Sequence, residues 1–460
     1  MIIGGGPGGY VCAIRAAQLG LKTVLAEVDR VGGECVNYGC IPSKSLITVS
    51  RLYEKMKDAE KFGLSTAGVS LDYSRMQAWK SEVVSKLVAG VEFLLKGNGV
   101  TVVAGEAEVV DRNRVRVLGP GGNVQEITTK NLVIATGTRP IELPGIEHDG
   151  SLVIGSKEAL ELTLRPEHML VIGGGAIGLE FACMYQKLGS RITIVEVMDQ
   201  LLPGSDPDAI RVVQRKLEAK GAKVYLKSRV VSVTKQSGRA IVEVETPGGV
   251  VRVEVDKVLQ SVGKRPRTDK MNLAALGVRT DQRGFILTDE RMMTNVQGVY
   301  AIGDVRGPPL LAHKASKEGM VAAECAAGLS SAGDWAVIPE AIFTDPEMAS
   351  AGLTAQKATQ AGHPVKTARF SFGALGRALS TGEGEGFVKV VFREDNGLVL
   401  GVQIVGPDAS NLISEIALAI EMGATVEDIA QTIHPHPTLP EAIMEASESA
   451  LGRPIHQMKL

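Results

Sequence analysis

Two stretches of the chain repeat one order of apolar and polar positions: a short apolar run, a glycine-rich turn, a helix-like repeat, and a second apolar run ending in glutamate. They cover residues 1–27 and 169–196. Short apolar runs bounded by glycine predict buried strands, and apolar positions recurring at three or four predict a helix packed against them. Each stretch therefore predicts a strand–turn–helix–strand unit, and the repetition predicts an α/β fold.

The turn of both units has the spacing Gly-x-Gly-x-x-Gly. The glycines are Gly4, Gly6 and Gly9 in the first unit, and Gly173, Gly175 and Gly178 in the second. Such a turn lets backbone N–H groups at a helix start approach a pyrophosphate. Glu27 and Glu196 each follow the third glycine by 18 residues, where an acid can bind a ribose. We interpret both units as dinucleotide sites; the alternative is a glycine-rich turn with an exposed glutamate.

The second acid also distinguishes between two nucleotides. The carboxylate of Glu196 repels a 2′-phosphate, which usually requires an arginine at that place. A free 2′-hydroxyl is therefore favoured. The second unit is predicted to bind NAD rather than NADP.

Other patterns predict the elements around these units. Residues 74–96 predict a long amphipathic helix. We expect its apolar stripe to be core, and the stripe comprises Met76, Trp79, Val83, Leu87, Val91 and Leu94. The run 131–137 predicts a buried strand followed by a proline-containing linker. Because Met1–Ile3 are the residues before Gly4, the first strand is either unusually short or begins upstream of the recorded start.

The pattern changes after Asp334. Strands at 387–392 and 399–405, followed by a helix at about 410–422, predict an α+β domain. The predicted fold class is α/β, with two Rossmann-like dinucleotide-binding domains and a C-terminal α+β domain. We expect four segments: 1–140 begins the first domain, 141–262 forms the second, 263–333 completes the first, and 334–460 forms the C-terminal domain.

The stretch from Cys35 to Lys44 directly follows the first unit. On a regular helix, residues five apart have Cα atoms roughly 8–9 Å apart, whereas a disulfide needs about 4.4–6.8 Å. If Cys35 and Cys40 bond, the helix must be interrupted, and Gly39 is best suited to the interruption. A strained, accessible disulfide is the reducible kind. The alternative is a pair of buried structural cysteines; the neighbouring dinucleotide unit favours a redox pair.

Two further clusters carry candidate chemistry. Asp304 follows an apolar run and Gly303, where it is either a ligand for a sugar-like hydroxyl or a turn former. His436 is suited to proton transfer near neutral pH, and Glu441 could orient it. The alternative for Glu441 is a capping box with Thr438 at the start of the next helix.

Composition excludes several classes of function. The 50 basic residues against 52 acidic ones leave no basic excess for nucleic acid. The sequence lacks a run of 18 apolar residues that would predict a membrane span. Five cysteines in 460 residues do not make a disulfide framework, and their spacing does not complete a metal site. Cys12, Cys183 and Cys325 are predicted to be small buried helix residues.

The N-terminus lacks the basic and apolar regions of a signal peptide. We therefore expect a cytoplasmic protein. If the protein belongs to an organelle and its targeting segment has been removed, the expected location is the mitochondrial matrix.

Taken in order, these motifs resemble the flavoprotein pyridine nucleotide-disulfide oxidoreductases. The resemblance rests on Gly4–Gly9, Cys35–Lys44, Gly173–Gly178, Gly303-Asp304 and His436–Glu441. Within that family, the stretches Gly8–Tyr10, Ile41–Lys44 and His434–Glu441 are most similar to the branch that oxidises dihydrolipoamide with NAD⁺.

The resemblance implies FAD on the first unit and NAD on the second. Glu27 would bind the adenosine ribose of FAD, and Asp304 its ribityl chain. Lys44 would lie near the flavin and pair with Glu180. Further cofactor contacts are implied at Gly33, Thr136, Gly137, Gly263 and Ala312.

The resemblance also implies the catalytic roles. Cys35 would exchange with substrate, and Cys40 would contact the flavin. His436, oriented by Glu441, would be the acid–base group and would reach the disulfide of the other subunit of a homodimer. The C-terminal domain would be the dimer interface. The implied partner is dihydrolipoamide on a lipoyl-carrying protein of a 2-oxoacid dehydrogenase or glycine-cleavage complex.

Other assignments remain as alternatives. Glutathione-type reductases use NADPH, against which Glu196 argues. Mercuric and thioredoxin reductases need further C-terminal cysteines or selenocysteine, which 451–460 lacks. A non-catalytic flavoprotein predicts a broken relay, whereas the cysteine pair, the histidine and its glutamate are all present. Tyr38 replaces a more usual small aliphatic residue and could tune access to the pair.

Overall fold

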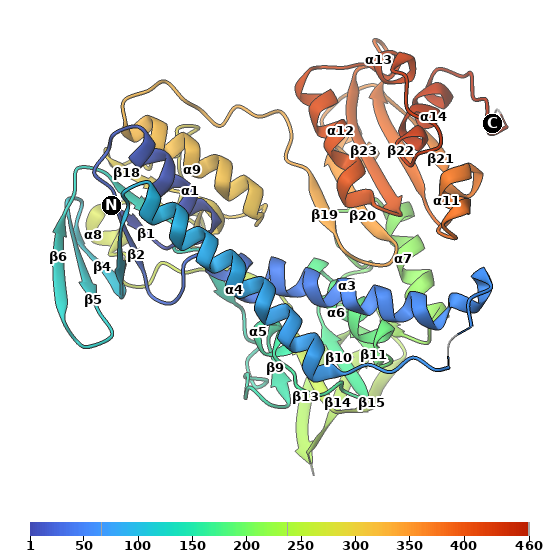
Figure 1. Cartoon of the computed structure of the whole chain (residues 1–460), viewed down its shortest axis with the longest axis horizontal. Coiled ribbons are helices and arrows are strands. Elements are labelled where there is room, and N and C mark those ends of the chain that lie inside the picture. The colour runs from blue at the N-terminus through green and yellow to red at the C-terminus, as the bar shows by residue number, and fades with distance from the viewer. Residues whose placement is uncertain (66, 237, 459–460) are drawn as a thin grey trace.

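The computed structural model describes residues 1–65, 67–236 and 238–458. It contains two parallel sheets covered by helices and an antiparallel sheet near the C-terminus. In Figure 1 the C-terminal sheet lies at one end of the molecule, the first parallel sheet at the other, and the second parallel sheet below them. This arrangement is the predicted fold class. The segment boundaries at 140, 262 and 333 stay predictions.

The first sheet is built around the short strand β1. Its order is β18 (Val299–Ala301), β7 (Leu132–Ile134), β1 (Ile2–Ile3), β2 (Val24–Glu27) and β3 (Thr101–Ala104). Both residues of β1 are buried and pair in parallel with both neighbours. Helices α1 (Pro7–Gln18) and α9 (Ala312–Ala326) lie side by side on one face (Figure 1). They approach closely because Gly319 lacks a Cβ, which would lie 2.4 Å from the Gly8 carbonyl oxygen.

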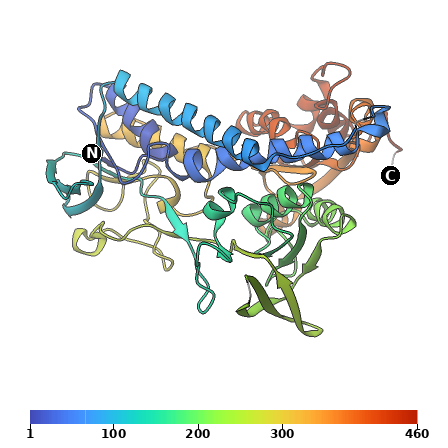
Figure 2. The ribbon, with the colours of Figure 1, turned by 60° about the horizontal axis from the view of Figure 1, so that its bottom comes forward.

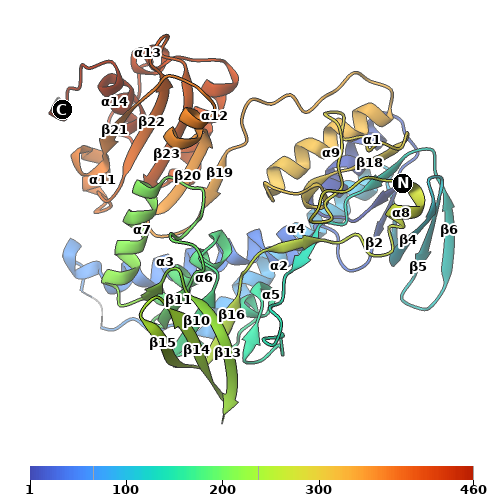
Figure 3. The same ribbon diagram turned by 180° about the vertical axis from the view of Figure 1, so that it is seen from behind.

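The second sheet repeats this plan. Its order is β12 (Lys223–Tyr225), β11 (Arg191–Val195), β10 (His168–Ile172), β16 (Lys257–Gln260) and β9 (Val153–Ile154). The apolar residues of β10 are buried, as expected for a central parallel strand. The accompanying helices are α5 (Ser156–Leu160), α6 (Ala176–Lys187) and α7 (Pro207–Ala219). An antiparallel meander projects from this unit in Figure 3: β13 (Arg229–Gln236), β14 (Arg239–Thr246) and β15 (Gly249–Val255).

The C-terminal domain is an antiparallel sheet with helices against it. Its order is β19 (Glu340–Ile342), β20 (Glu347–Gly352), β23 (Val399–Gly406), β22 (Phe387–Arg393) and β21 (Val365–Ser371). Its helices are α10 (Ala355–Gln360), α11 (Gly376–Ser380), α12 (Ala409–Glu421), α13 (Val426–Gln431) and α14 (Glu441–Ala450). The segment after α9 crosses from the first sheet to β19 (Figure 1).

Helix α3 (Cys40–Lys57) connects the three parts of the molecule. It follows α2 (Gly33–Tyr38) and runs beside α4 (Tyr73–Gly97), as Figure 2 shows along one edge of the molecule. The remaining elements are β4 (Glu106–Asp111), β5 (Arg114–Leu118), β6 (Val124–Thr128), β8 (Thr138–Pro140), β17 (Lys264–Pro266), α8 (Leu273–Leu276) and 3₁₀ turns at Ala59–Phe62, Gly303–Arg306 and Phe372–Ala374.

The expected core stripe of α4 is largely wrong. Met76 and Val91 are buried, but Trp79, Leu87 and Leu94 are 50%, 41% and 49% exposed. The buried row lies mostly one position further along the helix and comprises Met76, Lys80, Val84, Val88, Val91 and Leu95. Lys80 belongs to it because its ammonium donates to the Leu160 carbonyl oxygen and pairs with Glu161.

One strand also begins later than predicted. β2 starts at Val24 rather than Leu21, because the Leu21 N–H still donates to the Ala16 carbonyl oxygen at the end of α1. Cys12, Cys183 and Cys325 are buried on helices, as predicted. Within the described residues, the structure has no helix that combines the length and the apolar character needed to cross a membrane.

Candidate active site

The two cysteines lie on either side of a helix break. α2 ends at Tyr38 and α3 begins at Cys40, with Gly39 between them at φ −138° and ψ −106°. The predicted interruption at Gly39 is therefore present. A Cβ at Gly39 would lie 3.1 Å from the Glu34 carbonyl oxygen, so the tight approach favours glycine. In the described part of the chain both cysteines are free thiols.

The pair is electrostatically unequal. The hydrogen bond between the two thiols raises the pKa of Cys35 and lowers the pKa of Cys40. Burial raises both pKa values, and the Lys44 ammonium lowers both. Cys40 is therefore the more acidic thiol of the pair, and Cys35 the less acidic one.

Lys44 and Glu180 form an ion pair between α3 and α6. The Lys44 ammonium lies 2.8 and 3.1 Å from the two oxygens of Glu180, so the expected pair is present. The Glu180 side chain is only 11% exposed. Sequence reasoning missed Phe343, which lies just after β19. Its N–H donates to Glu180 Oε1 at 3.0 Å, and its ring centroid lies 4.6 Å from Lys44 Nζ.

The first glycine turn leaves room at the start of α1. Gly4 has φ +103°, and a Cβ at Gly9 would lie 1.8 Å from the Gly4 carbonyl oxygen. The Gly5 N–H donates to Glu27 Oε2 at 2.6 Å. Gly33 faces the turn, where a Cβ would lie 2.5 Å from Gly6 Cα. The glycines therefore permit both the close packing and the turn.

The second turn repeats this geometry. Gly173 has φ +100°, and a Cβ at Gly178 would lie 2.2 Å from the carbonyl oxygen of Gly173. The Gly174 N–H donates to Glu196 Oε2 at 2.7 Å. Among the described residues, no side chain caps α1 or α6 at its N-terminus. The N–H groups there are available to a pyrophosphate, so both turns fit a dinucleotide.

Asp304 lies in the 3₁₀ turn after β18. Burial raises its pKa, and Thr138 Oγ1 donates to Asp304 Oδ2 at 3.4 Å. Sequence reasoning missed the neighbouring Glu318, which is fully buried. It accepts the Gly303 N–H at 2.6 Å and pairs with Lys314 and Arg306. The available signal was the pair of opposite charges at 314 and 318, one helical turn apart.

The remaining predicted cofactor positions lie near ends of elements. Thr136 and Gly137 follow β7 and contact the Arg267 backbone: Thr136 Oγ1 donates to its carbonyl oxygen, and the Gly137 carbonyl oxygen accepts its N–H. Gly263 lies between β16 and β17, and Ala312 begins α9. Lys264, which directly follows Gly263, forms an ion pair with Glu34 of α2.

His436 and Glu441 form a hydrogen-bonded pair. His436 Nδ1 lies 2.8 Å from Glu441 Oε1, and the imidazole side chain is 79% exposed. Glu441 Oε2 accepts the Thr438 N–H at 2.7 Å. The Thr438 hydroxyl donates to the Pro435 carbonyl oxygen, and α14 has Pro440 rather than Thr438 at its N-cap, so the alternative capping box does not form. Burial alone would raise the pKa of Glu441, but the hydrogen bonds from Thr438 and His436 lower it below its usual value.

The structure does not bring this pair to the cysteines within one chain. The loop between α13 and α14 lies at the end of the C-terminal domain remote from α2 (Figures 1 and 3).

Tyr38 points to the loop after Glu27. Its hydroxyl donates to Asp29 Oδ2 at 2.5 Å, and Lys157 Nζ lies 3.9 Å from its ring centroid. Burial and this hydrogen bond raise the pKa of Tyr38 to about 12. Across residues 1–65, 67–236 and 238–458, no cluster of His, Cys, Asp or Glu is arranged for a metal ion.

Comparison with known families decides the assignment of the chain. The family described as "Pyridine nucleotide-disulphide oxidoreductase" matches residues 1–319, and its dimerisation domain matches residues 338–447. The chain belongs to this family. It uses FAD and NAD, for which the two glycine turns provide fitting sites. The second match supports a homodimer.

Curated relatives and solved structures cover nearly the whole chain. Dihydrolipoyl dehydrogenase of Geobacillus stearothermophilus is 46% identical over 456 residues, which cover 99% of this chain and 97% of the relative. Dihydrolipoyl dehydrogenase of Haloferax volcanii is 47% identical over 462 residues, covering 100% and 97%. The crystal structure of LpdA from Mycobacterium tuberculosis has a TM-score of 0.91 at 29% identity, covering 98% of this chain and 99% of that one. The roles of individual site residues stay predictions.

Proposed function

We propose that this chain is a dihydrolipoyl dehydrogenase, which oxidises dihydrolipoamide to lipoamide and reduces NAD⁺. The observation that carries the proposal is the cysteine pair at the α2–α3 break, in a chain 46–47% identical to two dihydrolipoyl dehydrogenases over its whole length. Glu196 supports NAD over NADP. When bound, FAD supplies the two-electron chemistry that links the reduced cysteine pair to NAD⁺.

The first chemical task is to make a thiolate from the substrate, since the thiolate is the nucleophile. Glu441 holds Nδ1 of His436, so Nε2 is the atom that takes the proton. The substrate thiolate attacks Cys35 Sγ of the oxidised pair and forms a mixed disulfide. Cys40 leaves as the thiolate, which the Lys44 ammonium stabilises.

The second substrate sulfur completes the exchange. Its thiolate attacks the substrate sulfur bound to Cys35, which closes the lipoamide disulfide and releases the Cys35 thiolate to take up a proton. The substrate has then lost two electrons, and the cysteine pair has gained them. The unequal pKa values of the pair favour a protonated Cys35 and an ionised Cys40 at this point.

We also propose that His436 acts on the cysteine pair of the other subunit. The remoteness of the α13–α14 loop from α2 supports an arrangement in which each site needs two chains. The physiological partner would be dihydrolipoamide on a lipoyl-carrying protein of a multienzyme complex. A reducing compartment, the cytoplasm or the mitochondrial matrix, suits an enzyme whose other cysteines are buried thiols.

The first prediction tests substrate and nucleotide together. The holoenzyme is mixed anaerobically with dihydrolipoamide, followed by NAD⁺ or NADP⁺. We expect NADH to form at 340 nm and NADPH to form far more slowly, because Glu196 repels the 2′-phosphate. Cys35→Ser should abolish the reaction and retain FAD. Normal turnover by that variant would contradict the proposed relay.

The second prediction tests the shared site. Cys35→Ser and His436→Gln chains with different tags are co-expressed, and mixed dimers are isolated. If each site takes its cysteines from one chain and its histidine from the other, one site of every mixed dimer is intact. We then expect about half of the wild-type activity per mixed dimer. Inactive mixed dimers, with both parents also inactive, would place the histidine and the cysteines of a site on the same chain.

A further inference from the structure

The Lys44–Glu180 pair has a third member from a distant part of the chain. Phe343 belongs to the connection between β19 and β20 of the C-terminal domain, whereas Lys44 and Glu180 lie on α3 and α6. Its backbone N–H donates to Glu180, and the face of its ring lies against the Lys44 ammonium. One residue therefore contacts both charges of the pair.

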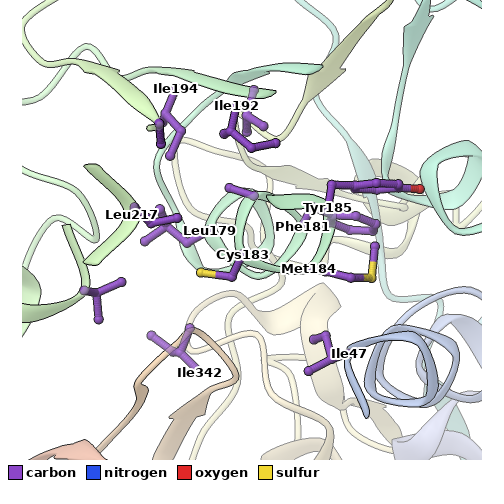
Figure 4. Packing of buried hydrophobic residues seen from close by; sticks show 14 of the residues in the cluster. Ile47, Leu179, Phe181, Cys183, Met184, Tyr185, Ile192, Ile194, Leu217 and Ile342 are labelled. Carbon is purple, nitrogen blue, oxygen red and sulfur yellow. The ribbon is translucent and has the colours of Figure 1, made fainter. Parts of the chain in front are cut away.

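The surroundings hold Phe343 in this position. Ile342, directly before it, packs in the same core as Ile47 of α3 and Leu179 of α6, and Figure 4 shows these side chains around α6. Directly after it, the carbonyl oxygen of Thr344 accepts a hydrogen bond from Arg51 of α3 at 3.0 Å. The connection is thus fixed to both helices on either side of Phe343.

This position matters because of what the lysine does. Lys44 follows Cys40 by one helical turn, and its ammonium is an opposite charge close to that thiol. A lysine side chain has four rotatable carbon segments, so its ammonium must be held to act at one place. Glu180 and the Phe343 ring restrict the ammonium from two directions.

We propose that Phe343 is a positioning residue of the redox centre, which acts through Lys44 and Glu180 and sets the ammonium where it stabilises the Cys40 thiolate. The proposal rests on the proposed function, because the thiolate matters as part of the cysteine relay. It also gives the C-terminal domain a direct contact with the redox centre of its own chain. The charged and titratable groups that face Cys40 are Cys35 of α2, Lys44 of α3 and Glu180 of α6.

The test measures the Cys40 thiolate rather than turnover. In holoenzyme carrying Cys35→Ser, the rate of Cys40 alkylation by iodoacetamide is followed against pH by mass spectrometry. The pH at which this rate is half-maximal is the midpoint. Adding Phe343→Leu should raise the midpoint and leave about two- to fivefold less Cys40 thiolate at a pH below it. This factor is the size of a lost cation–π contact. Phe343→Tyr keeps the ring and should restore the parent midpoint. Lys44→Met should raise the midpoint further.

The matched control is Phe387→Leu. Phe387 lies in the same hydrophobic core but stacks with Arg369, away from Lys44. A midpoint shift in Phe387→Leu equal to that in Phe343→Leu would overturn the proposal, because general loosening would then explain both. An unchanged midpoint in Phe343→Leu would overturn it as well. If Phe343→Leu loses FAD, Phe343→Met takes its place in the same comparison. Failure of the proposed function would appear separately, as wild-type enzyme that does not oxidise dihydrolipoamide.

Discussion

Gly178 lies against the Gly173 carbonyl oxygen at the place where any other residue would carry its Cβ. A methyl group at this position must push α6 away from the turn. The N–H groups at the start of α6 would then move from the place where we expect them to meet the pyrophosphate of NAD⁺. We therefore expect a single carbon atom at this position to change nucleotide binding as well as local packing.

The third prediction follows from this contact. Gly178→Ala should weaken NAD⁺ binding by roughly tenfold or more, because overpacking of this kind costs about 1–3 kcal/mol. FAD content should stay normal, since the first turn is untouched. The measurement is an NAD⁺ titration of the holoenzyme. Gly97→Ala is the control: that glycine ends α4 and has open space around it. Equal NAD⁺ affinity in both variants would contradict the prediction.

Residues differ in how far the sequence reveals them. The glycine turns and the break at Gly39 are predictable, because their cause lies within a few neighbouring residues. Phe343 is not, because it gains its role from partners brought together by folding. Glu318 is predictable only in part, because its spacing from Lys314 is visible in the sequence but its contact with the Gly303 N–H is not. His436 and Glu441 are an intermediate case. The sequence predicts their pairing as one of two alternatives, and folding shows that Glu441 contacts both His436 and the Thr438 backbone.

Helix α4 shows the same limit at the scale of an element. Its existence and length follow from the apolar period, but its buried face does not. Two adjacent rows of the helix are apolar, so periodicity does not select between them. The buried row is the one that contains Lys80, whose ammonium binds the Leu160 carbonyl oxygen and the Glu161 carboxylate at the end of α5. A lysine in the core row is a contact between distant segments that the period alone does not reveal.

The fourth prediction distinguishes the faces of this helix. Leu95 is fully buried and Phe93 is 75% exposed. Leu95→Ala should lower the free energy of unfolding by about 2–5 kcal/mol, the usual cost of a core truncation to alanine. Phe93→Ala should change it by about 0.5 kcal/mol or less. Urea unfolding of both holoenzymes, followed by circular dichroism, makes the comparison. A larger loss in Phe93→Ala would mean that the assigned faces are wrong.

At the scale of the whole molecule, an ion network joins its three parts. Asp345 precedes β20 and pairs with Lys187 at the end of α6 and with Lys216 and Lys220 at the end of α7. Glu54 of α3 shares two of these lysines. Burial alone would raise the pKa of Asp345, but the lysine charges hold this pKa far below its usual value.

The fifth prediction concerns acid stability. A carboxyl group whose pKa is lower in the folded state contributes stability above its unfolded pKa of about 3.9 and loses it as the pH falls towards the folded value. Asp345→Asn removes this contribution. We expect it to cost about 1.5–3 kcal/mol near pH 7, the usual worth of a hydrogen bond to a charged group, because Lys187 and Lys220 keep Glu54 as a partner. We also expect it to make the decline of stability below pH 4 shallower.

The measurement is the melting temperature of the holoenzyme between pH 3 and 7. Asp395→Asn serves as the control, since Asp395 pairs with Arg393 on the exposed surface and should leave the profile unchanged. Parallel profiles for Asp345→Asn and the wild type would show that the network does not determine acid stability.

The repeated glycine–acid geometry has a consequence for discrimination between the two ligands. Gly5 with Glu27 and Gly174 with Glu196 present the same device at two places. The same hydrogen-bonding arrangement cannot distinguish the adenosine of one dinucleotide from that of another. Each unit must therefore select its ligand through residues in which the two units differ. In the first unit these residues include Gly33, where a Cβ would lie 2.5 Å from Gly6 Cα, and in the second unit Leu201, whose Cδ2 would lie 2.5 Å from a Cβ at Gly174. We therefore expect an adenine nucleotide without a flavin or nicotinamide to bind at both turns with little preference.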